Sequence, residues 1–195
     1  VVGVYKITEG VRMKNIAICG KMASGKTTLA HTLRDEANFE VMSLAGAVKR
    51  LGRDLFGMVE KDRPLLQQIG MKMREIRPTV WIDYLISQAD SVNESQYCVA
   101  VDDVRFVNEA KRFKDEGWIL VKMDIGEELQ IERLKKTYPE NWEMHVDNRT
   151  DESELEVDEI PLDWFDLIIT AETDVKDYSE VMELAQSSVA LESRN

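Results

Sequence analysis

The sequence predicts an α/β protein in which helices cover a parallel sheet. Five short apolar segments alternate along the chain with longer segments of helical periodicity, which is typical of this class. The first of them, residues 14–19, is apolar almost throughout, as expected for a strand buried on both faces of the sheet. A chain of 195 residues with 44% hydrophobic residues is long enough to build one such core.

The expected elements follow one another in a regular order. The strand over residues 14–19 leads through a glycine into a helix over residues 27–37 and a second strand over residues 39–44. Three helical segments then follow without an obvious strand between them, so we expect a helical insert there. The remaining expected strands span residues 97–101, 118–123 and 165–170, and the expected helices span residues 45–56, 63–76, 80–91, 108–116, 127–138 and a last stretch from residue 175.

The charge of the chain is distributed unevenly along its length. The formal net charge is −12, yet residues 1–78 carry 14 Lys and Arg against 8 Asp and Glu, while residues 139–163 carry 1 against 10. A chain this acidic would be repelled by the phosphates of a nucleic-acid polymer, so we expect no such partner. The basic first part is still suited to a small phosphorylated ligand.

Cysteine content and apolar run length indicate a cytoplasmic protein. Cys19 and Cys98 both lie in strand-like apolar runs, so we expect reduced core thiols. No apolar run approaches the roughly 18 residues of a membrane span. Residues 1–12 precede Met13, a plausible start, and are expected to be an extension. Residues 139–163 have almost no apolar periodicity, which predicts a mobile, solvated excursion.

The strongest functional signal is a phosphate-binding motif directly after the first expected strand. Residues 20–27, G-K-M-A-S-G-K-T, satisfy the pattern G-x-x-x-x-G-K-[ST] and open an expected helix. The glycines let backbone N–H groups turn toward phosphate oxygens, the lysine reaches the β- and γ-phosphates, and the threonine hydroxyl ligates Mg²⁺. The motif therefore predicts binding of ATP and Mg²⁺. The expected nucleotide-binding residues are Gly20, Ala23, Ser24, Gly25, Lys26, Thr27 and Thr28, with Arg133 reaching over the phosphates from a later helix.

A second signal is the pair of carboxylates that ends the strand at residues 97–101. Beside a phosphate loop, a carboxylate at the carboxyl end of a strand can hold Mg²⁺, usually through water. Asp102 and Asp103 are equally placed for this, and a solvated strand end is the alternative. Arg105 would emerge at the same edge, where it either binds a phosphate or pairs with Asp103 or Glu109.

Other nucleotide-binding classes fit the chain less well. A GTPase needs an N/T-K-x-D motif and a D-x-x-G switch, but Val121 precedes the only K-x-D-like stretch and neither aspartate has a glycine three residues later. Motor and AAA-type ATPases usually have longer chains. One phosphate loop with a basic helical insert favours a kinase of a small molecule.

Several stretches resemble the bacteriophage deoxynucleoside monophosphate kinases, members of the P-loop nucleoside monophosphate kinase family. The most specific is residues 101–110, V-D-D-V-R-F-V-N-E-A, which resembles the family's D-V-R-F-x-N-E-A. The resemblance runs from residue 13 to about residue 184. It departs at the lid, where the chain has H-V-D-N-R at residues 145–149 in place of a His-x-Ser-Glu-like stretch. Further matching stretches are residues 43–49, 55–57, 61–63, 66–70 and 165–169, together with Arg74 and Trp81.

The resemblance implies a P-loop fold of the nucleotide kinase type and a reaction that converts ATP and a nucleoside or deoxynucleoside monophosphate into ADP and the diphosphate. It implies a five-stranded parallel sheet, a helical acceptor-binding insert at about residues 45–94 and a lid at about residues 126–163. The core would comprise residues 13–44, 95–125 and 164–195 of a single domain. The expected partner is a small nucleoside monophosphate, without a nucleic-acid polymer or membrane. We expect a monomer or homodimer in the cytoplasm, or in the host cytoplasm if a phage encodes it.

Cationic side chains of the insert and of the third strand are candidates to neutralise the acceptor phosphate. Arg74 and Arg105 are favoured because a guanidinium binds phosphate in a bidentate manner, whereas Arg63 and Arg77 also fit a solvated helix face. The expected catalytic residues are Lys26, Arg74, Arg105 and Asp103, the expected substrate-binding residues are Lys49, Arg74, Trp81, Arg105 and Glu109, the expected metal ligands are Thr27, Asp102 and Asp103, and Arg133 and Arg149 are candidate lid residues.

Two alternatives remain open at this point. A kinase of another metabolite, such as dephospho-coenzyme A, shares the same loop and sheet. A hydroxyl acceptor would need a carboxylate as general base, for which Asp35 and Asp62 are candidates, whereas a monophosphate oxygen is already an anionic nucleophile. A non-catalytic ATP-binding switch or assembly protein is the second alternative.

Overall fold

The computed structural model describes residues 13–95, 97–147, 149, 152–171 and 178–186. Residues 1–12, expected to be an extension, lie outside the described residues. So do the first residues of the helix expected from residue 175, which in the structure is α9 (Ser179–Gln186).

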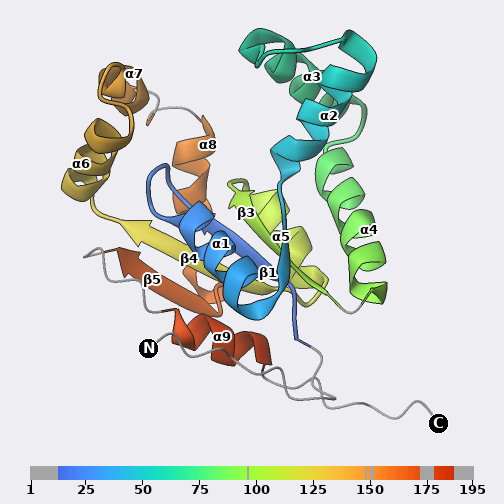
Figure 1. Cartoon of the computed structure of the whole chain (residues 1–195), viewed down its shortest axis with the longest axis vertical. Coiled ribbons are helices and arrows are strands. Elements are labelled where there is room, and N and C mark those ends of the chain that lie inside the picture. Colours follow the sequence, from blue (N-terminus) through green and yellow to red (C-terminus); the bar gives the residue numbers. More distant parts are fainter. Residues whose placement is uncertain (1–12, 96, 148, 150–151, 172–177, 187–195) are drawn as a thin grey trace.

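One all-parallel sheet confirms the α/β class (Figure 1). Its strand order is β2-β3-β1-β4-β5, which places β1 in the centre between β3 and β4. The central strand therefore ends where the chain connections diverge to either side, the usual place for a ligand in an open α/β sheet. The strands are β1 (Ile16–Gly20), β2 (Phe39–Met42), β3 (Cys98–Val104), β4 (Ile119–Ile125) and β5 (Leu167–Ala171).

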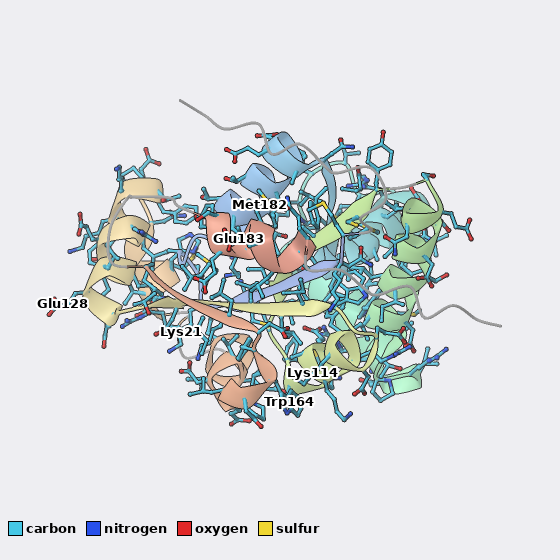
Figure 2. The ribbon with its side chains drawn as sticks, turned by 90° about the horizontal axis from the view of Figure 1, so that it is seen from below. Lys21, Lys114, Glu128, Trp164, Met182 and Glu183 are labelled. Atoms are coloured by element: carbon cyan, nitrogen blue, oxygen red, sulfur yellow. The ribbon has the colours of Figure 1, made fainter. Side chains whose placement is uncertain are left out.

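Helices cover both faces of this sheet. The alternation of side chains along β1 sends Ile16 and Ile18 to one face, where they pack with α1 (Lys26–Ala37) and α9. Ala17 and Cys19 point to the other face, which α4 (Val80–Glu94) and α5 (Val107–Asp115) cover. Figure 2 shows the two layers, with Met182 of α9 on one side of the strands and Lys114 and Trp164 on the other.

The expected helical insert forms a separate arm beside the sheet (Figure 1). It consists of α2 (Leu44–Phe56) and α3 (Arg63–Ile76), followed by α4. Ser43 begins α2 by accepting a hydrogen bond from the N–H of Gly46, and Asp62 begins α3 by accepting one from Leu65. The indole Nε1 of Trp81 donates to the carbonyl of Gly70 at 3.2 Å, which joins α4 to α3.

The acidic segment before β5 differs from the expectation for residues 139–163. It contains α7 (Trp142–Asp147), α8 (Glu152–Leu155) and two 3₁₀ turns, Glu156–Glu159 and Leu162–Trp164. Val157 and Ile160 are each only 1% exposed, and Ile160 belongs to the core beneath α5. The prediction of a solvated segment is therefore wrong at Val157 and Ile160, which are buried. These two isolated apolar residues anchor the segment, although they produce no periodic signal.

Among the described residues, no helix combines the length and the apolar character that crossing a membrane requires.

Candidate phosphate-binding site

The phosphate loop connects β1 to α1 and packs against the end of β4. Gly20 has φ +147°, and a Cβ built on it would lie 2.4 Å from the carbonyl oxygen of Met123. Gly25 has φ +106°, which L side chains rarely adopt. Ala23 also has a positive φ, of 61°. Glycine is therefore required at both ends of the loop, at Gly20 by close approach and at Gly25 by backbone conformation.

Lys26 extends across this loop from the first turn of α1. Its side chain is 7% exposed, and its Nζ donates a hydrogen bond to the carbonyl oxygen of Lys21 at 2.6 Å. Burial, and secondarily the neighbouring charge of Arg105, lowers the pKa of Lys26 to about 8, although Glu154 and Asp102 oppose the shift. A poorly solvated ammonium of this kind would gain strongly from an anion in the loop.

The structure gives different surroundings to Asp102 and Asp103, which lie inside β3 just before its last residue, Val104. Asp102 Oδ2 accepts a hydrogen bond from the hydroxyl of Thr27 at 2.7 Å, beside the phosphate loop. Asp103 is half-buried, and its two oxygens accept from the backbone N–H groups of Leu44 and Ala45 at 2.8 and 2.9 Å. Burial raises the pKa of Asp103, partly offset by these two bonds. Asp103 therefore anchors the start of α2.

Oxygen donors suited to Mg²⁺ meet at the Thr27–Asp102 pair. Mg²⁺ prefers hydroxyl and carboxylate oxygens and fills its other positions with water and substrate phosphate, so two protein donors fit such a site. No group of three or more His, Cys, Asp or Glu that could hold a metal ion occurs in the described part of the chain.

Glu109 joins the end of β3 to the helical insert. Its Oε2 accepts from the backbone N–H groups of Arg105 and Phe106 at 3.1 and 3.2 Å, while its Oε1 lies 3.4 Å from Nη2 of Arg74. The Arg74 guanidinium also stacks 4.9 Å from the ring centre of Phe106. Burial raises the pKa of Glu109 to about 7, while the two backbone bonds and Arg74 lower it. Glu109 thus joins the guanidinium of Arg74, from α3, to the backbone of Arg105, directly after β3.

Glu154 is not among the site residues expected from the sequence, yet it lies directly on the phosphate loop. Its carboxylate is 2% exposed, accepts from the backbone N–H of Met22 at 2.7 Å and pairs with the guanidinium of Arg105. Asp158 pairs with Lys21 at 2.6 Å a little further along the same segment. No local signal distinguishes Glu154 from the other carboxylates among the ten in residues 139–163. It differs from them only by its contact with Met22, 132 residues earlier in the chain.

Helix α6 (Glu127–Thr137) lies against the same loop from another side. Gln130 donates to the carbonyl of Met22 at 2.9 Å, and Arg133 donates to the carbonyls of Ala23 and Ser24 at 3.2 and 3.4 Å. Arg133 is therefore in contact with the phosphate loop.

Other candidate residues lie outside this cluster. Trp81 is buried and holds α3 to α4, Arg77 pairs with Asp83 at 2.7 Å, and Arg149 pairs with Glu127 at 2.9 Å. Lys49 and Arg63 are exposed, and Thr28 lies in α1 with its carbonyl accepting from Thr32. The two candidate general bases are placed elsewhere: Asp35 is paired with Arg34, and Asp62 caps α3.

A groove of about 690 Å³ runs between β2, α2 and α4. None of the predicted site residues lines it.

Comparison with known proteins identifies the fold. No protein-family model matches the chain. A crystal structure described as a "putative kinase" from Chloroflexus aurantiacus matches with a TM-score of 0.53 and 16% identity, over 89% of this chain and 94% of that one. Dephospho-CoA kinase from Campylobacter jejuni matches with a TM-score of 0.50 and 16% identity, over 88% and 92% of the two chains. Together with the sheet order and the loop, these matches show an α/β P-loop kinase fold.

One curated protein is similar in sequence. A mimivirus protein described as "Putative deoxynucleotide monophosphate kinase" is 27% identical over 140 residues, which is 56% of this chain and 72% of the relative.

Proposed function

We propose that the protein is a kinase that transfers a phosphoryl group from ATP to a nucleoside or deoxynucleoside monophosphate. The observation that carries the proposal is the arrangement of cations around the loop. Lys26 donates to the loop carbonyl of Lys21, and the guanidinium of Arg105 pairs with Glu154 beside the loop. Arg74 contacts Glu109, which also accepts from the backbone N–H of Arg105. The similarity to the mimivirus protein, a "Putative deoxynucleotide monophosphate kinase", favours a deoxynucleotide acceptor.

On the donor side, the loop and Lys26 would bind the β- and γ-phosphates of ATP. Thr27 and Asp102 would hold Mg²⁺, which when bound neutralises phosphate charge. The first turn of α1 directs its backbone N–H groups and positive dipole end toward the same place. Arg133 of α6 is placed to add a further positive charge at the loop.

On the acceptor side, Arg105 and Arg74 would hold the monophosphate in line with the transferred group. A phosphate oxygen attacks as an anion, so this side needs positioning and charge neutralisation but no general base. The guanidinium groups suit that task, because they stay charged at every physiological pH.

A hydroxyl acceptor is the second candidate, since a buried carboxylate, Glu154, lies beside the loop. A general base must reach the hydroxyl proton, and Glu154 is the described carboxylate that contacts the loop backbone. Because the fold is similar to that of dephospho-CoA kinase, the experiment below also includes dephospho-coenzyme A as an acceptor.

An acceptor screen separates these possibilities. ADP release is measured with ATP and Mg²⁺ alone, with each common ribo- and deoxynucleoside monophosphate, and with dephospho-coenzyme A. We expect release only with a nucleoside monophosphate, and a loss of roughly 10²–10³-fold in kcat for Lys26→Ala. ADP release that does not depend on any acceptor would indicate an ATP-binding switch. ADP release with dephospho-coenzyme A alone would indicate the second candidate, a hydroxyl acceptor.

The remaining parts of the proposal follow from this acceptor. We propose residues 45–94 as the acceptor-binding insert, residues 126–163 as the lid, and a cytoplasmic monomer or homodimer acting on small molecules.

A further inference from the structure

The contacts of Glu154 with the phosphate loop are of the kind that a phosphate oxygen would make there. One carboxylate oxygen accepts from a backbone N–H of the loop, at Met22, and the other pairs with the guanidinium of Arg105. Carboxylates and phosphates bind the same donors, backbone N–H groups and guanidinium groups, through charge-assisted hydrogen bonds. At 2% exposure, the carboxylate is enclosed by these partners.

We propose that Glu154 is a stand-in for substrate phosphate, which holds the loop and Arg105 until ATP displaces it. The inference rests on the proposed use of ATP at this loop and is independent of the identity of the acceptor.

Displacement follows from charge. The triphosphate of ATP brings several negative charges to Lys26 and the loop N–H groups, and a buried carboxylate on the same loop would repel them strongly in a poorly solvated site. The Met22 N–H donates to Glu154 at 2.7 Å, so it cannot serve a phosphate oxygen fully at the same time. Either the carboxylate leaves or ATP binds weakly.

The segment is built so that α8 can leave without unfolding the core. Val157 and Ile160 are buried and anchor the chain directly after α8, and Glu156 accepts from the backbone N–H of Val107 at 3.1 Å. Leu155 is more than half exposed. Among the described contacts of α8 side chains with the loop, those of Glu154 are the ones that hold it there.

The same displacement would free Arg105 for the acceptor phosphate. Arg105 cannot give its full guanidinium to a monophosphate while it pairs with Glu154. Binding of ATP would thereby prepare the acceptor site. The carboxylate of Glu154 would then determine that ATP binds before the acceptor.

The test compares two charge-neutral substitutions in one segment. The Kd of AMP-PNP with Mg²⁺ is measured by calorimetry, without acceptor, for the wild type, Glu154→Gln and the matched control Glu156→Gln. Glu154→Gln should bind AMP-PNP about tenfold more tightly, because one charge-assisted competitor is removed. Glu156→Gln removes the same charge from the segment but not from the loop, and should change the Kd by less than about twofold.

A second measurement needs no variant. Hydrogen exchange in a peptide covering residues 152–156 should speed up when AMP-PNP binds the wild type. Slower exchange would show that the segment closes over the nucleotide, which overturns the proposal. Equal effects of the two substitutions would assign the gain to general electrostatics, and weaker binding by Glu154→Gln would make the residue part of the ATP-bound state. Either result overturns the proposal as well.

These outcomes separate the two proposals. A large loss of kcat with an unchanged Kd in Glu154→Gln would assign it as a general base and overturn the stand-in role. AMP-PNP binding that behaves as expected, with no monophosphate accepted in the screen, would remove the proposed acceptor and leave the stand-in role intact. Failure of AMP-PNP to bind any variant would remove both.

Discussion

Lys26 carries its charge in a position from which water is largely excluded. Burial lowers its pKa to about 8, well below the usual value for lysine, so the free protein begins to lose this charge just above physiological pH. A bound triphosphate favours the charged form and restores it.

The pH dependence of catalysis should follow from that shift. We expect kcat/KM for ATP to fall above pH about 8, because this parameter reports the free protein, while kcat at saturating ATP holds to higher pH. Steady-state rates between pH 6.5 and 10 measure both. Lys26→Arg should remove the fall in whatever activity it retains, and a flat wild-type profile up to pH 10 would contradict the assignment.

Asp102 and Asp103 are adjacent residues with separate tasks. Asp102→Ala should raise the Mg²⁺ concentration needed for half-maximal rate by about tenfold, since Asp102 contacts the Thr27 hydroxyl. Asp103→Ala should instead lower the free energy of unfolding by about 1–3 kcal/mol, because the N–H groups of Leu44 and Ala45 at the start of α2 lose their acceptor. Rates titrated with Mg²⁺ and urea unfolding separate the two, and an exchange of the two effects would refute this division.

At the scale of elements, Arg74 links the helical insert to the sheet. It comes from α3 but contacts Glu109 of α5 and the ring of Phe106, the residue directly before α5. The acceptor side of the proposed site therefore depends on how α3 is held against the core.

Loss of Arg74 should mainly weaken acceptor binding. Arg74→Ala should raise KM for the monophosphate by about 10–100-fold with a smaller change in kcat, because the acceptor phosphate is charged before and after transfer. Lys72→Ala, which removes an exposed cation from the same helix, serves as the control and should leave KM unchanged. A normal KM in Arg74→Ala would place the acceptor elsewhere.

At the scale of the whole molecule, the acidic segment closes one side of the core. Ile160 belongs to the same hydrophobic core as Ala110 and Phe113 of α5. Asp166 accepts from the backbone N–H of Leu120 at 2.8 Å and fixes the entry into β5. The acidic segment, whose Glu154 contacts the phosphate loop, is thus held in place by the hydrophobic core through Ile160.

Truncation of the buried Ile160 side chain should destabilise the whole fold. Ile160→Ala should lower the free energy of unfolding by about 2–4 kcal/mol, as expected for a fully buried aliphatic side chain. Leu162→Ala, two residues further on and 60% exposed, should change it by less than about 0.5 kcal/mol. Urea denaturation of both variants measures the difference. Equally small changes in the free energy of unfolding would show that the segment is solvated, as expected from the sequence.

The sequence by itself determined the features that depend on neighbouring residues. The alternation of apolar and helical segments along the chain predicted the parallel sheet, and the contiguous motif at residues 20–27 predicted the loop. Both predictions were possible because glycine conformation and strand burial are local requirements. It could not choose between Asp102 and Asp103, since both end the same strand. Only the tertiary structure separated them, placed Glu154 on Met22 and buried Ile160 within an acidic run. Those outcomes depend on contacts between residues far apart in the chain, whose energy arises from burial and paired charge that no local pattern encodes.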